Sequence, residues 1–339
     1  MAAPEIDRSF TPIEHNEENI LEVNALKKYF PIQDGILKHT VGYVKAVDGV
    51  TFNIKRGTTM GLVGESGCGK TTTGRTILRL TDGKTSGQVL FNGQEIYDLS
   101  AKEIRALRPK MQIIFQDPYS SLSPRMPVSE IIGEAVREHS IVPKEEFDDY
   151  IEGIMSDCGL MPYHKDRYPH EFSGGQRQRI CIARALALNP DFIVCDEPVS
   201  ALDVSIQAQI INLLQDLQEK HNLTYLFISH DLSVVKHISD TIGVMYLGSL
   251  VEYGSRDDIF DSPAHPYTEA LLSAIPVPDP TVKTNRIVLE GSIPSPANPP
   301  EGCKFHTRCA KCMDKCKTEI PVQKEISPGH FVCCHLYDE

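Results

Sequence analysis

The sequence contains no long apolar run, no excess of positive charge and no internal repeat. No stretch approaches the roughly 18 consecutive apolar residues that a membrane-spanning helix needs. The N-terminal segment is polar and acidic, without the basic and then apolar pattern of a secretory signal. Because 34 lysines and arginines face 46 acidic residues, the net charge of −12 argues against general nucleic-acid binding. We therefore expect a cytoplasmic protein that binds no nucleic acid and reaches a membrane only through a partner.

The composition indicates a globular chain of about two domains, since 41% of its 339 residues are hydrophobic and 24% are charged. From about residue 20, short β-like runs alternate with helical patterns, which is typical of an α/β fold with a largely parallel sheet. We expect strands at Met60–Val63, Phe192–Cys195 and Tyr225–Ile228, and a helix over Lys70–Leu80. A second helix is indicated by apolar residues at helical spacing, namely Ile206, Ile210, Leu213, Leu214 and Leu217.

Segments of different composition predict the domain organisation. Residues 1–19 are expected to form a flexible leader, and residues 20–275 the main domain. Within that domain, residues 101–186 carry mostly helical patterns and are expected to form an inserted helical subdomain. From Pro276 prolines become frequent, which predicts a linker into a small C-terminal module over residues 276–339.

A glycine-rich loop follows the first predicted strand and precedes the first predicted helix. Its residues are Gly64, Glu65, Ser66, Gly67, Cys68, Gly69, Lys70 and Thr71, with Thr72 next. The segment matches G-x-x-x-x-G-K-[ST], in which glycines let successive backbone N–H groups point at one anion and the helix dipole adds to phosphate binding. Lys70 is placed to contact the β- and γ-phosphates, and the Thr71 hydroxyl to bind Mg²⁺. The loop predicts a nucleoside triphosphate site without identifying the class of protein.

Two acidic residues, Asp196 and Glu197, end the predicted strand at Phe192–Cys195. Asp196 is placed to hold Mg²⁺ through its water shell. Glu197 could polarise an attacking water as a general base. Taken alone, the two residues fit equally well a strand that ends in an acidic turn.

A second anion site is indicated at Ser173, Gly174, Gly175 and Gln176. Ser173 is a favourable N-cap, and the glycines open a helix whose exposed N–H groups and dipole favour a phosphate. An ordinary capped helix would not account for two phosphate sites in one chain. With this motif the sequence resembles the ABC ATPase family, whose signature begins Ser-Gly-Gly-Gln, over roughly residues 20–275. The resemblance implies an ATP- and Mg²⁺-binding P-loop NTPase fold, with a RecA-like core and a helical subdomain.

The resemblance also implies roles for residues outside these motifs. Gln116 corresponds to the Q-loop glutamine, which contacts Mg²⁺ and the attacking water, and His230 to the switch histidine near the γ-phosphate. Ser200–Asp203 corresponds to the D-loop, which communicates across a dimer. Two such domains enclose two ATP molecules head to tail, so Ser173 would face the ATP that a partner's loop binds.

The adenine contact has three candidates. Members of the family stack the base on an aromatic residue upstream of the phosphate loop. Phe30 is the residue we favour, with Tyr29 and Tyr43 as alternatives. Any of the three could equally be a packing residue, since aromatic rings bury well.

Further stretches resemble the F-type ATPase subunit of oligopeptide/dipeptide ABC importers almost from end to end. They include Phe115–Arg125, Tyr168–Phe172, Tyr225–Val235 and His265–Thr268. The resemblance implies a peripheral subunit on the cytoplasmic face of the cell membrane that hydrolyses ATP to power peptide import. Its implied partners are a related D-type ATPase in a heterodimer, two transmembrane permease subunits and an extracytoplasmic peptide-binding protein. The alternatives are an importer of another solute such as nickel, an exporter subunit, or a soluble ABC ATPase acting outside transport.

Six of the ten cysteines lie in the C-terminal module. Thiolates in a reducing compartment commonly hold metal, and four of them suit either a [4Fe–4S] cluster or tetrahedral zinc. The C-terminal extension of the importer subunits can hold a [4Fe–4S] cluster, and by resemblance its ligands here are Cys303, Cys309, Cys316 and Cys334. Cys312 and Cys333 depart from that pattern and leave the fourth ligand open between Cys333 and Cys334. The alternatives are zinc, especially through Cys309 and Cys312 or through His335, and no metal. We expect a structural role, because so short and proline-rich a unit needs a cross-link.

Overall fold

The computed structural model of the chain describes residues 13–35, 38–82, 86–275 and 286–338. The chain divides into two compact units, one of residues 1–54, 60–97 and 230–339, and one of residues 55–59 and 98–229. Most of the predicted leader, residues 1–12, and the start of the predicted linker, residues 276–285, lie outside the described residues. Along the chain, residues 98–229 of the second unit follow residues 60–97 of the first and precede residues 230–339, and residues 55–59 form its second, short segment.

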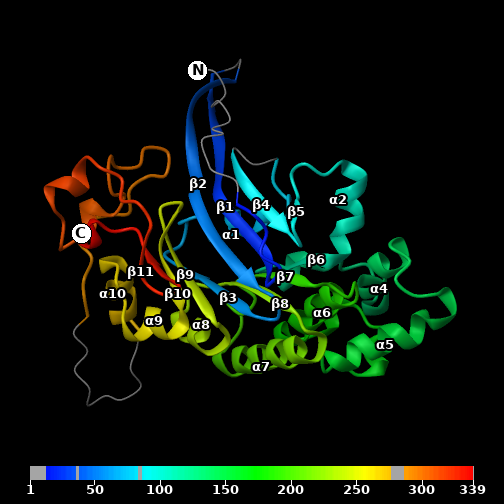
Figure 1. Cartoon of the computed structure of the whole chain (residues 1–339). Coiled ribbons are helices and arrows are strands. Elements are labelled where there is room, and N and C mark those ends of the chain that lie inside the picture. Colours follow the sequence, from blue (N-terminus) through cyan, green and yellow to red (C-terminus); the bar gives the residue numbers. More distant parts are fainter. Residues whose placement is uncertain (1–12, 36–37, 83–85, 276–285, 339) are drawn as a thin grey trace, which may run out of the picture. The chain divides into compact units, whose positions relative to one another are not determined.

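One sheet of the first unit contains four strands in the order β2-β1-β4-β5 (Figure 1). Their bounds are β1 Asn19–Asp34, β2 His39–Lys55, β4 Ser86–Phe91 and β5 Gln94–Glu95. β4 pairs antiparallel with β1, where Leu21 lies opposite Phe91, and also with β5. Leu21, Val23 and Leu26 of β1 are fully buried, so this sheet has a well-packed apolar face.

The other strands of the first unit follow one another in the order β11-β12-β10-β9-β3. Their bounds are β3 Thr59–Val63, β9 Thr241–Tyr246, β10 Ser249–Ser255, β11 Lys324–Ser327 and β12 His330–Val332. The strand predicted at Met60–Val63 is confirmed, and it is parallel to β9. The remaining pairs are antiparallel, so this unit is less parallel than the sequence indicated. The C-terminal module contributes β11 and β12 to the sheet, which the sequence did not predict.

The helices of the first unit are α1 Lys70–Ile77, α8 Leu232–Ile238, α9 Arg256–Asp261 and α10 Pro266–Ser273. α1 begins where predicted and ends earlier than Leu80. The reason is Arg79, which has a left-handed φ of 50°. The Leu80 N–H donates to the Arg75 carbonyl at 2.8 Å and the Arg79 N–H to Thr76 at 2.9 Å, which is the bonding pattern of a Schellman motif. The helix therefore stops by satisfying its own last carbonyls.

The second unit contains three parallel strands in the order β8-β7-β6. Their bounds are β6 Met111–Ile114, β7 Phe192–Asp196 and β8 Thr224–Ile228, so both strands predicted for this part of the chain are confirmed. All five residues of β7 and of β8 are buried, as expected for strands covered on both faces. β6 lies within the segment 101–186, where helical patterns dominate, because a run of four residues is too short for periodicity to distinguish strand from helix.

The helices of the second unit are α2 Ala101–Leu107, α3 Pro118–Ser121, α4 Val128–Glu138, α5 Phe147–Asp157, α6 Gly174–Leu186 and α7 Val204–His221. α4, α5 and α6 pack against one another (Figure 1). On α7, the predicted apolar face is buried at Ile210 and at all three predicted leucines, whereas Ile206 is only partly buried. Short 3-10 helices occupy Arg108–Lys110, Lys144–Glu146, Pro162–His164, Pro169–Glu171, His306–Arg308, Asp314–Lys317 and His335–Tyr337.

The packing of α7 predicts how two substitutions on it should differ. Ile210 is fully buried and Val204 is 81% exposed. We expect Ile210→Ala to lower the free energy of unfolding by about 2–5 kcal/mol, because it leaves a cavity in the core. Val204→Ala should change it by less than about 0.5 kcal/mol. Urea denaturation followed by circular dichroism measures both, and equal effects would contradict this packing.

Candidate nucleotide site

The phosphate loop joins β3 to α1 and passes close to two other strands. A Cβ atom at Gly64 would lie 2.2 Å from the Met245 carbonyl oxygen of β9, and one at Gly69 would lie 2.1 Å from that of Ala46 in β2. Both glycines also have positive φ, 147° and 108°, which residues with a side chain rarely adopt. Only glycine fits at these two positions, so the outer glycines of the motif are required by packing as well as by curvature.

Lys70 lies at the loop itself. It is the first residue of α1 and is only 5% exposed. Its Nζ donates to the carbonyl oxygens of Gly64, at 2.7 Å, and Glu65, at 3.1 Å. Thr71 and Thr72 follow in the first turn of α1 and are partly buried. Burial raises the pKa of the neighbouring Cys68 thiol, and the smaller opposing effect of Lys70 does not reverse this. Cys68 is therefore a protonated packing residue rather than a nucleophile.

Glu65 is held by two side chains from outside the loop. Its backbone N–H donates to the Tyr267 hydroxyl on α10 at 2.9 Å. Its carboxylate accepts two hydrogen bonds from the Arg308 guanidinium, Nη1 to Oε2 at 2.7 Å and Nη2 to Oε1 at 3.1 Å. No local sequence pattern indicates either partner, because Tyr267 and Arg308 lie more than 200 positions from Glu65 along the chain.

Asp196 and Glu197 lie at the carboxyl end of β7 in the second unit. Asp196 is 1% exposed. Glu197 has a left-handed φ of 49°, and its N–H donates to the Ile228 carbonyl at 3.0 Å. The Gln116 side-chain amide donates to the Glu197 carboxylate at 2.8 Å. The structure thus brings together a glutamine and an acid that stand 81 positions apart, and it holds the acid in a backbone conformation that is uncommon for a non-glycine residue and often marks a functional site.

Ser173 caps α6, as the sequence predicted. Its hydroxyl accepts a hydrogen bond from the Gln176 N–H at 3.3 Å, and the Gln176 side chain accepts one from the Ser173 N–H at 3.1 Å. Ser173 is exposed. A Cβ atom at Gly175 would lie 2.6 Å from Ile206 Cγ2, so a glycine there lets α6 begin against the start of α7. With Gly174 beside it, this turn presents a helix N-terminus to solvent, the local geometry that binds anions.

Asp203 and His230 are exposed residues that each lie just before a helix, Asp203 before α7 and His230 before α8. Asp203 caps α7, accepting from the Ile206 N–H at 3.1 Å and the Ser205 hydroxyl at 2.9 Å. The Ile206 N–H lowers the pKa of this carboxyl. His230 is exposed just before α8. The phosphate loop and His230 belong to the first unit. The second unit holds Gln116, Ser173, Gln176, Asp196, Glu197 and Asp203.

The three candidates for adenine stacking lie on β1 and β2. Phe30 is 38% exposed, and Lys28 Nζ lies 4.8 Å from the centre of its ring. The Tyr29 hydroxyl donates to Asp48 Oδ1, which ties that ring to β2. Tyr43 is partly buried. Phe30 is the most exposed of the three candidate rings.

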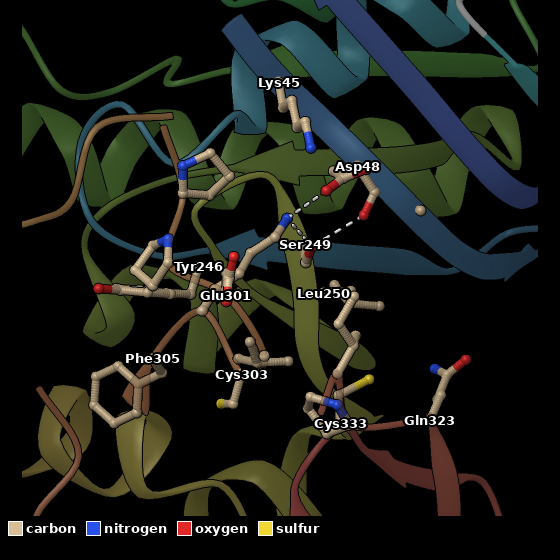
Figure 2. A pocket seen from close by; sticks show the side chains of 18 of the residues that line it. Lys45, Asp48, Tyr246, Ser249, Leu250, Glu301, Cys303, Phe305, Gln323 and Cys333 are labelled. Carbon is tan, nitrogen blue, oxygen red and sulfur yellow. Dashed lines mark hydrogen bonds and ion pairs between the residues drawn. The ribbon is translucent and has the colours of Figure 1, made fainter. Parts of the chain in front are cut away.

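A cavity of about 720 Å³ lies in the first unit between β2, β10 and the C-terminal module. Lys304 Nζ donates to Asp48 Oδ2 at 2.8 Å and Ser249 Oγ at 2.6 Å, the contacts dashed in Figure 2. Figure 2 also shows Cys303 and Cys333 in the wall of this cavity. These two cysteines therefore face open space.

The structure does not support the metal site predicted from the sequence. Within residues 286–338 and the other described ranges, no three or more His, Cys, Asp or Glu side chains are grouped so that they could hold a metal ion. The expected ligands differ in surroundings: Cys316 and Cys334 are buried, whereas Cys303 and Cys309 are partly exposed.

Two family models match the chain. The ABC transporter model matches residues 47–200, and that of the oligopeptide/dipeptide transporter C-terminal region matches residues 251–316. The chain is 57% identical to the oligopeptide transport ATP-binding protein AppF of Bacillus subtilis strain 168, over 95% of this chain and 98% of AppF. It is 55% identical to YkfD of the same strain, over 94% of this chain and 95% of YkfD.

Solved structures of ABC proteins also resemble this one. cbiO1 from Clostridium perfringens, part of the transporter complex cbiONQ, is 28% identical with a TM-score of 0.62, covering 73% of this chain and 92% of cbiO1. The ATP-binding cassette MJ0796, solved as a dimer bound to ADP and Pi, is 27% identical with a TM-score of 0.61, covering 70% of this chain and 98% of that one.

No helix among the described residues is long and apolar enough to cross a bilayer. The phosphate loop, the capped Ser-Gly-Gly-Gln turn and the paired Gln116 and Glu197 lie on a fold shared with known ABC proteins. With relatives this similar over nearly the whole length, the chain belongs to the ABC transporter family, as one of its ATP-binding, ATP-hydrolysing proteins.

Proposed function

We propose that this chain is the ATP-hydrolysing subunit of an importer for oligopeptides or dipeptides. The observation that carries the proposal is the 57% identity to AppF, a protein named for oligopeptide transport, over 95% of this chain. The match of residues 251–316 to the oligopeptide/dipeptide transporter C-terminal region adds support from a second part of the chain. The subunit would sit peripherally on the cytoplasmic face of the membrane, bound to two permease subunits that receive peptide from an extracytoplasmic binding protein.

The phosphate loop is the proposed binding site for the triphosphate of ATP. Its curled backbone between Gly64 and Gly69 directs N–H groups toward one anion, and α1 adds the positive end of its dipole. Lys70 already lies at the loop, hydrogen-bonded to two of its carbonyls, and can exchange these contacts for the β- and γ-phosphates. Phe30, whose ring is partly exposed, is the proposed adenine contact.

The Mg²⁺ ligands that we propose are those that the family resemblance implies, one in the first unit and two in the second. The Thr71 hydroxyl, the Asp196 carboxylate and the Gln116 amide oxygen are of the kind that Mg²⁺ prefers. Asp196 is 1% exposed at the end of β7, so the packing around it restricts the motion of its side chain. Bound Mg²⁺ would neutralise charge on the phosphate oxygens.

Glu197 is the proposed general base. It accepts a proton from water as the water oxygen attacks the γ-phosphorus, and ADP leaves with the bridging oxygen. The Gln116 amide donates to one of its carboxylate oxygens at 2.8 Å, which orients the carboxylate and leaves the other oxygen to accept the proton.

The second phosphate-binding turn is the proposed contribution of this chain to a partner's ATP. The exposed N-terminus of α6, with Ser173 as its cap, would cover the γ-phosphate bound by a related D-type ATPase in a head-to-tail heterodimer. Asp203 and His230, both at element ends, would carry contacts across that interface and toward the γ-phosphate. MJ0796, solved as a dimer with ADP and Pi, is a precedent for pairing of this fold.

Glu197→Gln should retain ATP binding and reduce hydrolysis by about 10²–10⁴-fold, since it removes only the proton acceptor. ATP affinity is measured by calorimetry and turnover by phosphate release, in the assembled transporter. Glu219→Gln, an exposed acid of α7, is the matched control and should hydrolyse ATP normally. Undiminished turnover of Glu197→Gln would rule out its role as the base.

The transport function is tested by assembly and uptake. The tagged chain should co-purify with two hydrophobic permease subunits and a second ATP-binding subunit. Vesicles containing this complex should take up a labelled peptide mixture in the presence of ATP and the binding protein. A stable complex that lacks membrane subunits, uptake of nickel but no peptide, or a homodimer of this chain would each contradict a named part of the proposal.

We also propose that Cys303, Cys309, Cys316 and Cys334 bind a [4Fe–4S] cluster. A zinc ion needs four ligands about 2.3 Å from one atom, whereas in a cluster each thiolate binds a different iron. Support for the cluster comes from the family resemblance that names these four ligands and from the match of residues 251–316 to the oligopeptide/dipeptide transporter C-terminal region.

The cluster proposal predicts about four iron atoms per chain and a brown colour in anaerobically purified protein. Cys309→Ser or Cys334→Ser should abolish both. Cys312→Ser and Cys333→Ser are the matched controls and should leave iron and colour intact. Colourless protein with stoichiometric zinc, or iron loss in the control variants alone, would overturn the assignment.

A further inference from the structure

Glu65 connects the phosphate loop to the C-terminal module. Three of its groups are occupied: the carbonyl accepts from Lys70, the N–H donates to Tyr267, and the carboxylate accepts from Arg308. Glu65 directly follows Gly64, whose carbonyl is the other acceptor for Lys70. A shift of Glu65 would therefore displace both carbonyls that hold the phosphate-binding lysine.

Arg308 is the stronger of the two outside contacts to Glu65. Its side chain is 7% exposed and that of Glu65 25%. The two hydrogen bonds form a bidentate pair between charged groups, the geometry with the highest directional specificity. The guanidinium also lies 5.9 Å from the centre of the Tyr246 ring. Removal of Arg308 would leave the Glu65 carboxylate partly buried without its counter-charge, which favours a move of the loop toward solvent.

Arg308 is itself anchored independently of the loop. Phe305, three residues earlier, is 1% exposed. The centre of its ring lies 5.2 Å from that of Tyr246 and 5.3 Å from that of Tyr267. Lys304 binds Asp48 on β2 and Ser249 on β10, and Figure 2 shows Phe305 and Tyr246 together in the cavity wall below these contacts. The segment Lys304–Arg308 thus contacts β2, β9, β10 and α10. These contacts hold Arg308 in place beside the loop.

We infer that Arg308 is a positioning residue for ATP binding: through Glu65 it sets the place of the phosphate loop, so that the C-terminal module forms part of the nucleotide site. This inference rests on the proposed role of the loop as the ATP site and goes beyond it. Arg308 acts through Glu65 and makes no contact with ATP itself. The expected consequence is a change in affinity for ATP in the single chain, before any partner is added.

The test is calorimetric binding of MgATP to the purified full chain. Arg308→Gln and Glu65→Gln should each weaken binding about tenfold, the effect of losing a charged hydrogen bond. The double variant should bind no more weakly than the weaker single variant, because both substitutions break one contact. Arg308→Lys keeps the charge and should bind with intermediate affinity. Multiplied effects in the double variant would overturn the inference.

Two controls separate loop positioning from other effects. Lys311→Gln breaks the 2.8 Å ion pair between the same module and Glu269 of α10, and it should leave ATP affinity unchanged within about twofold. An equal loss in Lys311→Gln would indicate general loosening of the module and contradict the inference. Lys70→Ala tests the proposed ATP site itself. If Lys70→Ala abolishes binding while Arg308→Gln and Glu65→Gln bind normally, only the role of Arg308 fails. If Lys70→Ala binds normally, the proposed ATP site fails.

Discussion

The phosphate loop of the first unit is confined by backbone and side chains from distant parts of the chain. Carbonyl oxygens of Met245 and Ala46 occupy the places where side chains at Gly64 and Gly69 would begin. On its outer side, Arg308 holds the carboxylate of Glu65. A glycine-rich segment has many conformations in an unfolded chain. These contacts select the one in which Lys70 lies at the loop and α1 starts from it, and every proposed step of ATP binding depends on that selection.

The second unit holds its polar site residues by local backbone devices. Glu197 occupies a left-handed conformation directly after β7 and meets Gln116 there. Ser173 and Asp203 are the N-caps of α6 and α7, so their side chains are engaged with the backbone before any ligand is considered. A strained backbone conformation directly after a strand often marks a functional site. The N-terminus of a helix is likewise a common place for binding anions. Each unit thus contains one turn that opens a helix with exposed glycines, the loop before α1 in the first unit and the capped turn before α6 in the second.

Much of the fold was accessible from the sequence because its signals are local. Buried strands such as β7 and β8 are continuous apolar runs between turns, and the helix after the phosphate loop starts at the residue predicted. The observed elements differ from the predicted ones where local sequence signals compete or are short. The run at β6 is too brief for periodicity, and the left-handed Arg79 ends α1 before its apolar pattern does.

The sequence by itself determined the phosphate loop, the capped turn at Ser173, the acids after β7 and the family, since each depends on residues adjacent in the chain. Only the tertiary structure decided that Gln116 hydrogen-bonds to Glu197 and that Arg308 hydrogen-bonds to Glu65. It also decided that β12 of the C-terminal module pairs with β10. Among the described residues it also shows no group of side chains placed to hold a metal ion, whereas the number of C-terminal cysteines and the family resemblance predict a [4Fe–4S] cluster. These cases share one physical reason. The sequence shows which side chains the chain has to form a site, whereas the packing of strands and helices sets the distances between them.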